Sequence, residues 1–539
     1  MSLSYVRGRE AALLEQSIHT TFTRAVDAYP ERDALVSVHQ NLRYTYAQLH
    51  EEVERTARGF AGLGLGPGDR IGIWATNCAE WVMVQLAAAR AGILLVNINP
   101  AYRIHELEYA LMKSRIQAIF LKERDERSDY REILDQAARR GGVALDHRIY
   151  LDTDSWDAFL ANGRPYPEVE VAPNDVANLQ YTSGTTGFPK GVMLTHRGLV
   201  NNGLFIGKVL KVSHEDRICV PVPLYHCFGC VIGTMVAINV GAAMILPNDR
   251  FHALPTMQAL ESERCTLVYG VPTMFIAQIN HADFARYDFT SLRGGIMSGA
   301  PCPVEIMKRV MTEMHCPEIT IVYGQTESSP VITGSMVDDS MERRVSTVGF
   351  PLHETEVKLI DPNTGATVPL GVRGELCTRG YLVMKGYDGD EKATRGVVDA
   401  DGWLHTGDLA ILREDGYIHL TGRVRDVIIR GGENVYPKEV EEFLYTNPKV
   451  AAVEVVGLPD VKFGEVVLAW IRLKPGVTAT EEEIREFCKG EISHFKIPTY
   501  VRFVDEFPAT ANGKTQKYII RQQEIELRGL KQAAEVVTA

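Results

Sequence analysis

The chain is best interpreted from one stretch, Tyr181-Thr-Ser-Gly-Thr-Thr-Gly-Phe-Pro-Lys-Gly-Val192. Its glycines allow the backbone to turn with positive φ and to bring N–H groups close to a ligand. Its hydroxyls add rotatable hydrogen-bond donors, and Lys190 adds a compact positive charge suited to phosphate. The spacing differs from the Gly-x-x-x-x-Gly-Lys-Ser/Thr pattern of a Walker A loop. A flexible surface loop is the alternative for any Gly/Ser/Thr cluster, but this order of residues predicts a loop that wraps a polyphosphate.

Composition narrows the class of protein. A chain of 539 residues exceeds the usual size of one hydrophobic core, so we expect two or more domains. The formal net charge of −12 argues against nucleic acid as a partner, because a phosphate backbone requires a basic surface. The nine cysteines follow no disulfide-like spacing, the first ten residues lack the apolar core of a signal peptide, and Arg90 interrupts the best candidate for a membrane-spanning run. We therefore expect a cytoplasmic protein without a membrane span.

Helix and strand patterns alternate before the loop. Thr45 and Gln48 are spaced as a capping box that opens a helix. Asn77 is expected to cap a second helix, which ends near Gly92. The predicted order from there is strand 71–75, helix 77–90, strand 93–98, helix 105–115 and strand 117–121. Strand, helix and strand in short succession predict parallel βαβ units and an α/β fold.

The segment 220–240 carries candidate ligands ahead of an apolar helix predicted at 231–240. Cys227 and Cys230 have a metal-like spacing, but a structural zinc requires a second ligand pair that the sequence lacks. We interpret them as buried thiols. His226 stays open between a core or surface residue and a residue that contacts a substrate.

Three later strands, predicted at 267–271, 294–297 and 319–322, each end in a glycine-containing turn. Ligands of α/β sheets bind at the carboxyl ends of strands. Gly299 and Ala300 are small enough to let a flat ring approach the backbone, and Tyr323 can stack on such a ring. Glu327 near a polyphosphate requires a cation between them, and Mg²⁺ is the usual one. A capping or surface glutamate is the alternative.

The last third of the chain predicts a small β region and then a separate α+β unit. Asp408 has two oxygens that can accept hydrogen bonds from two neighbouring hydroxyls, although a turn residue is the alternative. Lys514 follows Gly513 in a short loop pattern near the C-terminus. The stretch 422–437 marks the expected end of the large domain, and we expect domains at 1–422 and 423–539.

These motifs resemble, in the same order, those of the adenylate-forming superfamily, which includes acyl-CoA synthetases, luciferases and peptide-synthetase adenylation domains. The resemblance covers essentially the whole chain and is closest to the short- to medium-chain acyl-CoA synthetases. It implies a large N-terminal domain of layered sheets and a smaller, mobile α+β C-terminal domain. It also implies a reaction in which a carboxylic acid and ATP form acyl-AMP and pyrophosphate with Mg²⁺, before CoA displaces AMP.

The resemblance also implies residue roles. Lys514, Lys190 and Glu327 are the implied catalytic residues, and Glu327 and Thr182 are the implied Mg²⁺ ligands. Asp408 is expected to bind the ribose hydroxyls with Arg423 as its partner. The other implied ATP- or AMP-binding residues are Thr182, Ser183, Gly184, Thr185, Thr186, Gly187, Gly299, Ala300, Pro301, Tyr323, Gly324 and Thr326. The implied acyl-pocket residues are His226, Phe228, Tyr269, Met297 and Val331, while Gly431 and Gly432 serve the CoA step and Arg425 is the hinge.

Other functions fit the sequence less well. Amino-acid activation requires an acidic partner for the α-ammonium group, and 225–229 offers none. Acyl-AMP ligases that load a carrier protein carry an insertion between the domains, and 420–426 leaves no room for one. A non-catalytic scaffold would be expected to lack at least one of the residues Lys190, Glu327, Asp408 and Lys514, and all four are present. A luciferase-like oxidase fits the sequence less well still. The pocket candidates are mostly uncharged, which fits an apolar or weakly polar tail, and the resemblance implies a short- to medium-chain acid. The oligomeric state stays open, with a homodimer as one alternative.

Overall fold

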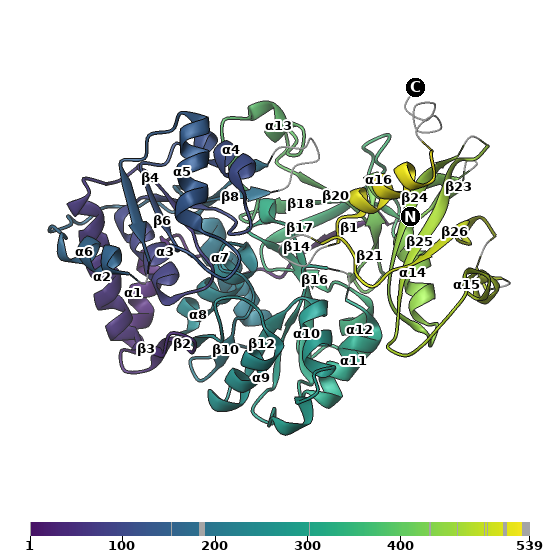
Figure 1. The fold of residues 1–539 in the computed structure, drawn as a ribbon, viewed down its shortest axis with the longest axis horizontal. Coiled ribbons are helices and arrows are strands. Elements are labelled where there is room, and N and C mark those ends of the chain that lie inside the picture. The colour runs from purple at the N-terminus through teal and green to yellow at the C-terminus, as the bar shows by residue number, and fades with distance from the viewer. Residues whose placement is uncertain are drawn as a thin grey trace. The chain divides into compact units, whose positions relative to one another are not determined.

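The protein is described here by a computed structural model, which covers residues 2–151, 153–182, 189–300, 302–430, 433–460, 462–489, 491–492, 494–509 and 515–530. Its contacts divide the chain into two compact units, whose helices and strands are labelled in Figure 1. The first unit comprises Met1–Tyr5, Lys358–Cys377 and Thr406–Ala539, and the second comprises Val6–Val357 and Thr378–His405.

The first sheet of the second unit contains the predicted βαβ elements. Strand β4 pairs in parallel with both β5 and β6, as the alternation of helix and strand predicted. On the other side of β5, strands β8 and β9 form an antiparallel pair. The strand order is β19 (Gly386–Tyr387), β9 (Lys190–Thr195), β8 (Val176–Thr182), β5 (Leu94–Asn97), β4 (Arg70–Trp74), β6 (Ala118–Leu121) and β7 (His147–Tyr150).

Helix α2 (Tyr46–Gly62) begins as predicted, because Thr45 and Gln48 form a reciprocal capping box. Helix α3 (Ala79–Ala91) ends at Gly92, which adopts a left-handed conformation. The predicted cap at Asn77 is wrong, since the helix is preceded by Cys78 and has no side-chain cap. The Asn77 amide instead donates to the Val222 carbonyl at 3.0 Å and accepts from the Leu224 N–H at 2.8 Å. The Asn77 side chain therefore binds a distant segment of the chain and does not cap the helix.

The second sheet of this unit brings the three predicted glycine turns to one edge. Strands β12, β13 and β14 are parallel neighbours, so their carboxyl ends lie side by side. Figure 1 shows α9 (Ala253–Ser262), α10 (Pro272–Ile279) and α11 (Val304–Glu313) beside these strands. The order is β16 (Phe350–Pro351), β15 (Val331–Gly334), β14 (Glu318–Gly324), β13 (Gly294–Met297), β12 (Leu267–Gly270), β10 (Arg217–Cys219), β11 (Ala243–Leu246), β2 (Asp33–Ser37) and β3 (Leu42–Thr45).

Further helices complete the second unit, including two in the stretch 125–173, where the sequence pattern gave no prediction. They are α1 (Ile18–Ala28), α4 (Ile104–Ser114), α5 (Tyr130–Gly141), α6 (Asp154–Ala161), α7 (His196–Val209), α8 (Thr234–Val240), α12 (Met341–Ser346) and α13 (Glu391–Arg395). The α-helix expected at 231–240 begins only at Thr234, because a π-helical turn at Phe228–Gly233 precedes α8. Among the described residues, no helix is long and apolar enough to cross a membrane.

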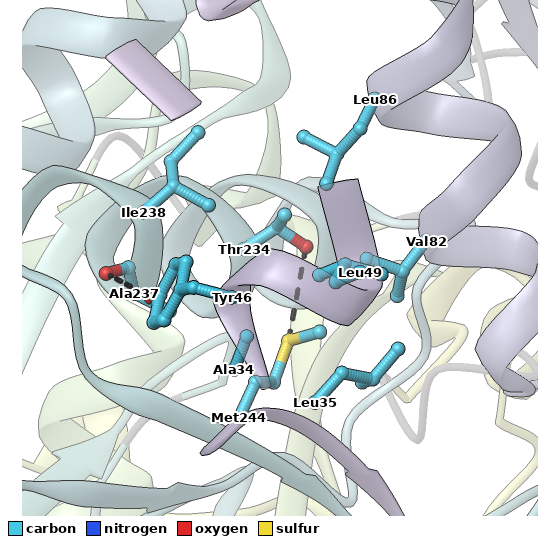
Figure 2. A pocket seen from close by; sticks show the side chains of 10 residues that line it. All are labelled: Ala34, Leu35, Tyr46, Leu49, Val82, Leu86, Thr234, Ala237, Ile238 and Met244. Atoms are coloured by element: carbon cyan, nitrogen blue, oxygen red, sulfur yellow. Dashed lines mark hydrogen bonds between the residues drawn. The ribbon is translucent and has the colours of Figure 1, made fainter. Parts of the chain in front are cut away.

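A small internal cavity of the second unit is shown in Figure 2. Its volume is about 10 Å³, which is about the room that one water molecule requires. The Tyr46 hydroxyl lies 2.8 Å from the Ala242 carbonyl, and the Thr234 hydroxyl donates to the Met244 sulfur. The cavity is therefore a packing defect in an apolar core and is too small for a substrate. Its lining residues are Ala34, Leu35, Tyr46, Leu49, Val82, Leu86, Thr234, Ala237, Ile238 and Met244.

The first unit holds most of the predicted small β region together with the C-terminal α+β elements. The small β region is a sheet ordered β1 (Tyr5–Arg7), β17 (Thr355–Ile360), β18 (Gly374–Gly380), β20 (Leu404–Leu412) and β21 (Ile418–Arg423). The C-terminal sheet is ordered β23 (Glu433–Val435), β22 (Ile428–Arg430), β25 (Gly464–Leu473) and β24 (Val450–Asp460), with β26 (Tyr500–Phe503) on β25. Helices α14 (Pro437–Tyr445) and α16 (Lys517–Leu527) pack on β24, and α15 (Glu481–Cys488) opens with the predicted Thr480–Glu483 capping box.

Specific contacts explain why both parts fall into one unit. The Lys438 ammonium donates to the Leu420 carbonyl at 2.7 Å, and Arg373 donates to the Thr421 hydroxyl at 2.9 Å. The Arg373 guanidinium also lies 3.5 Å from the centroid of the Tyr436 ring. These contacts join residues on both sides of the expected boundary between 422 and 423, which stays a prediction.

Candidate functional site

The polyphosphate-loop sequence joins two neighbouring antiparallel strands. Thr182, at the end of β8, is the register partner of Lys190, at the start of β9. The intervening candidates Ser183, Gly184, Thr185, Thr186 and Gly187 lie outside the described residues. A strand follows Lys190 where a Walker A loop would be followed by a helix, in agreement with the sequence distinction.

Glu327 lies in a short 3₁₀ turn, Thr326–Ser328, that follows β14 and contacts β9. Its backbone carbonyl accepts a hydrogen bond from the Met384 N–H at 2.9 Å. Its side-chain Oε1 accepts a hydrogen bond from the Tyr387 hydroxyl at 2.8 Å. The Lys190 ammonium lies 5.0 Å from the centroid of the same tyrosine ring. Lys190 and Glu327, which are 137 positions apart in sequence, thus share one contact residue.

Sequence reasoning missed Tyr387. It lies on β19, a strand of two residues whose pairing with β9 sets its place beside Lys190. A lone tyrosine after a glycine carries no periodic or motif signal, so only the sheet pairing reveals it.

The donor set of this region fits a hard divalent cation. Glu327 supplies carboxylate oxygens and Thr182 supplies a hydroxyl oxygen, and oxygen ligands of this kind are those that Mg²⁺ prefers. These residues would hold the ion together with phosphate oxygens of the nucleotide.

The carboxyl edge of β13 and β14 has the small residues expected of an adenine-binding surface. Gly299 has φ +85°, a conformation that a residue with a side chain rarely adopts. A Cβ atom on Gly324 would lie 1.9 Å from the Pro330 carbonyl oxygen, so this position requires glycine. Ala300 is partly exposed, and Tyr323 and Thr326 are buried. Pro301 lies outside the described residues, and the adenine role of this edge stays a prediction.

The acyl-pocket candidates are only partly brought together. The Phe228 and Tyr269 rings are inclined at 28° to each other, with centroids 6.1 Å apart. His226 Nδ1 accepts a hydrogen bond from the Phe228 N–H at 3.1 Å, so its neutral ring carries the proton on Nε2. Met297 is fully buried in the hydrophobic core with residues such as Phe275 and Met307. Strand β15 is held by the Asn202 amide, which donates to the Val331 carbonyl. Their roles in a pocket stay predictions.

A buried row of amides behind this segment was also missed. The Gln180 amide donates to Asn178 Oδ1 at 2.7 Å, Asn178 donates to Asn97 Oδ1 at 2.8 Å, and Asn97 donates to the Tyr225 carbonyl at 3.0 Å. The chain of bonds therefore fixes the segment that carries His226 and Phe228 to strands β5 and β8. The available signal was two amides at alternate positions of an otherwise apolar strand, which places both on one face.

The prediction of buried thiols at 227 and 230 is confirmed. Both cysteines are buried, and neither forms a disulfide bond. Burial raises the pKa of Cys230, and amide groups of Asn97 and Gln180 lie near its sulfur. This sulfur therefore stays a neutral thiol, which is a poor metal ligand.

In the first unit, Asp408 and Arg423 meet as expected. They are direct register partners on β20 and β21, and the Arg423 Nε donates to Asp408 Oδ1 at 2.6 Å. The Asp408 residue is only 7% exposed, whereas the Arg423 side chain is 42% exposed. The charged pair orients the carboxylate, so Asp408 is suited to bind vicinal hydroxyls.

We expect Asp408→Asn to weaken ATP and AMP binding to a similar extent. Both nucleotides carry the ribose, and the loss of a charge-assisted hydrogen bond corresponds to about tenfold or more in affinity. Calorimetric titration with each nucleotide measures this, with Asp415→Asn as the control from the turn of the same hairpin. Weakened ATP binding with unchanged AMP binding would contradict a ribose contact.

The remaining candidates are the expected hinge residue, Arg425, and three residues that the structure does not describe. Arg425 is in a 3₁₀ turn, Val424–Asp426, that links β21 to β22. Gly431, Gly432 and Lys514 lie outside the described residues.

Comparison with known proteins identifies the two parts of the chain. Residues 22–388 match the model of the AMP-binding enzyme family, and residues 439–514 match its C-terminal domain. YngI of Bacillus subtilis (strain 168), a provisionally named acyl-CoA synthetase, is 47% identical over 96% of this chain and 99% of its own length. The mitochondrial medium-chain acyl-CoA ligase ACSF2 of Danio rerio is 41% identical over 98% of this chain and 92% of its own length.

Solved structures agree with this result. The anthranilate CoA ligase AuaEII in complex with anthranoyl-AMP has a TM-score of 0.86 at 25% identity, covering 95% of this chain and 98% of that one. ATP-bound MatB from Rhodopseudomonas palustris has a TM-score of 0.84 at 27% identity, covering 94% and 99%. The expected fold is thereby confirmed, and the chain belongs to the AMP-binding enzyme family.

Proposed function

We propose that this AMP-forming acid:CoA ligase activates a short- to medium-chain carboxylic acid. The acid attacks the α-phosphorus of ATP to form acyl-AMP and pyrophosphate, and CoA then displaces AMP to form the thioester. Full-length similarity to acyl-CoA ligases, including a medium-chain enzyme, supports this reaction. The observation that carries the site assignment is the shared contact of Lys190 and Glu327 with Tyr387.

The first half-reaction brings an anionic acid to an anionic triphosphate. Lys190 binds the phosphates as a point charge, and Glu327 with Thr182 would hold Mg²⁺. When bound, Mg²⁺ supplies charge neutralisation at the phosphate oxygens. Asp408 orients the ribose through its pair with Arg423. Lys514 is assigned to the transition-state charge at the α-phosphate, Arg425 to the hinge, and Gly431 with Gly432 to the CoA step.

The acid is assigned from the pocket candidates and from the relatives. Phe228 and Tyr269 supply apolar ring surface, while His226 supplies a polar side chain. This lining favours an uncharged tail over an α-amino acid. We also propose a role in fatty acid metabolism and a cytoplasmic location, the latter supported by cysteines that form no disulfide bonds.

We expect pyrophosphate release to be greatest with acids of about four to ten carbons, because the pocket candidates suit an uncharged tail and a relative is a medium-chain acyl-CoA ligase. The assay compares a series of straight-chain acids with and without CoA, and thioester formation is followed in parallel. Palmitate or an α-amino acid as the preferred substrate would contradict the substrate class. Pyrophosphate release without CoA thioester would instead favour a carrier protein as the acceptor.

A further inference from the structure

Tyr387 is held firmly between the two catalytic candidates of the second unit. Its backbone N–H donates to the Thr394 hydroxyl at 2.9 Å, and its strand pairs with β9 at Val192. The residue is 7% exposed, so its side chain is confined. The hydroxyl reaches Glu327, and the ring lies beneath the Lys190 ammonium.

The hydroxyl donates to Glu327. An ionised carboxylate can only accept hydrogen bonds, so the phenolic O–H is the donor in this contact. A carboxylate has about four lone-pair positions, and the tyrosine occupies one of them. The carboxylate is therefore oriented while most of its capacity to bind a cation is retained.

The ring contact restrains Lys190 in a different way. A cation is attracted to the face of an aromatic ring by the ring quadrupole. This attraction consumes none of the three N–H donors of the ammonium group, which stay available for phosphate oxygens. A salt bridge in the same place would have neutralised the charge that the phosphates require.

We propose that Tyr387 is a positioning residue that fixes the spacing of Lys190 and Glu327, with its hydroxyl orienting the carboxylate and its ring orienting the ammonium. The inference rests on the roles of Lys190 and Glu327 in the proposed function. Tyr387 itself transfers no proton.

Two substitutions separate the two contacts. Tyr387→Phe removes the bond to Glu327 and keeps the ring, whereas Tyr387→Leu removes both. ATP binding is measured by calorimetry without acid or CoA, so that no reaction occurs, and with or without Mg²⁺. We expect Tyr387→Phe to weaken binding about tenfold in the presence of Mg²⁺ and to leave Mg²⁺-free binding unchanged. Tyr387→Leu is expected also to weaken Mg²⁺-free binding, by about threefold or more.

Tyr130→Phe is the matched control. The Tyr130 hydroxyl donates to Asp125 at 2.8 Å, the same distance and the same pair of groups, and the residue is also buried. This variant should leave ATP affinity unchanged both with and without Mg²⁺. Its thermal melt measures how much stability is lost when a buried tyrosine–carboxylate hydrogen bond is removed. If Tyr387→Leu does not fold, Tyr387→Phe decides the question alone.

Two reference variants distinguish failure of this inference from failure of the site assignment. Glu327→Gln should remove the Mg²⁺-dependent gain in ATP affinity, and Lys190→Met should weaken binding under both conditions. If Glu327→Gln behaves so while Tyr387→Phe binds like the unmodified protein, Tyr387 has no positioning role. Equal losses in Tyr387→Phe with and without Mg²⁺ would indicate a general structural role and also overturn the inference. If Glu327→Gln keeps the full Mg²⁺ effect, the role of Glu327 is wrong and the inference falls with it.

Discussion

Lys514→Ala is expected to reduce the rate of acyl-AMP formation about a hundredfold to a thousandfold. Negative charge develops around the α-phosphorus as the acid attacks, and a positioned cation stabilises that state more than the ground state. Loss of one such charge or donor typically costs about 2.7–4 kcal/mol of transition-state stabilisation. Pyrophosphate release measures this half-reaction directly.

The second half-reaction serves as the internal comparison. Thioester formation from preformed acyl-AMP and CoA should change far less, because the CoA sulfur attacks the acyl carbonyl carbon and breaks its C–O bond to AMP, so the α-phosphorus is not attacked in that step. Lys489→Ala removes an exposed lysine of the same unit and controls for a general charge effect. Equal losses in both half-reactions would assign Lys514 to binding or folding.

Glu524→Ala is expected to destabilise the first unit by about 3 kcal/mol. Glu524 lies on α16, its side chain is fully buried, and it accepts hydrogen bonds from Trp470, Arg502 and Arg528 at 2.7–2.8 Å. Removal of one partner from a buried ion pair costs about 3–5 kcal/mol because the other charges are left uncompensated. The arginine side chains are 40% and 27% exposed, so water relieves part of this cost and the lower figure applies.

Urea unfolding and hydrogen exchange of the β25 amides measure this loss, with Glu526→Ala, an exposed carboxylate on the same helix, as the control. Burial alone would raise the pKa of Glu524, but the bonds from Arg502, Arg528 and Trp470 lower it below the ordinary 4.5. Its stabilising contribution is therefore present above pH 4.5 and is lost as the pH falls through the folded value. Glu524→Ala should reduce the loss of unfolding free energy that occurs as the pH falls below 4.5. A variant that is as stable and as acid-sensitive as the unmodified protein would refute this account.

The sequence predicted regular local features well. The capping boxes at Thr45 and Thr480 were correct because both partners lie within one helical turn. The strands at the glycine turns were correct because buried parallel strands are continuous apolar runs. The pairing of Asp408 with Arg423 followed from the family resemblance, and the hairpin register accounts for it physically.

The failures share a physical cause. Asn77 is a strong local cap by composition, but its amide bonds to a segment almost 150 residues away. Tyr387 and the amide row of Asn97, Asn178 and Gln180 are functional candidates only because strands distant in sequence pair with one another. The π-helical turn before α8 likewise has no periodic signal in a uniformly apolar stretch. Local patterns cannot encode contacts that exist only after the sheets assemble.

The attachment of α16 constrains how the C-terminal lysine can be delivered. Ala509 and Thr515 are joined by an isolated β-bridge, and the Gln516 N–H donates to the Pro508 carbonyl at 2.7 Å. Lys517 and Glu524 then bind α16 to neighbouring elements through ion pairs. Lys514 is one peptide bond from Thr515, so their α-carbons are separated by about 3.8 Å whatever the loop does. Any displacement of the Lys514 backbone much larger than this must therefore be made by the sheet and α16 moving together. If Lys514 acts only in the first half-reaction, as proposed, its removal from the site would be a movement of this folded unit as a whole.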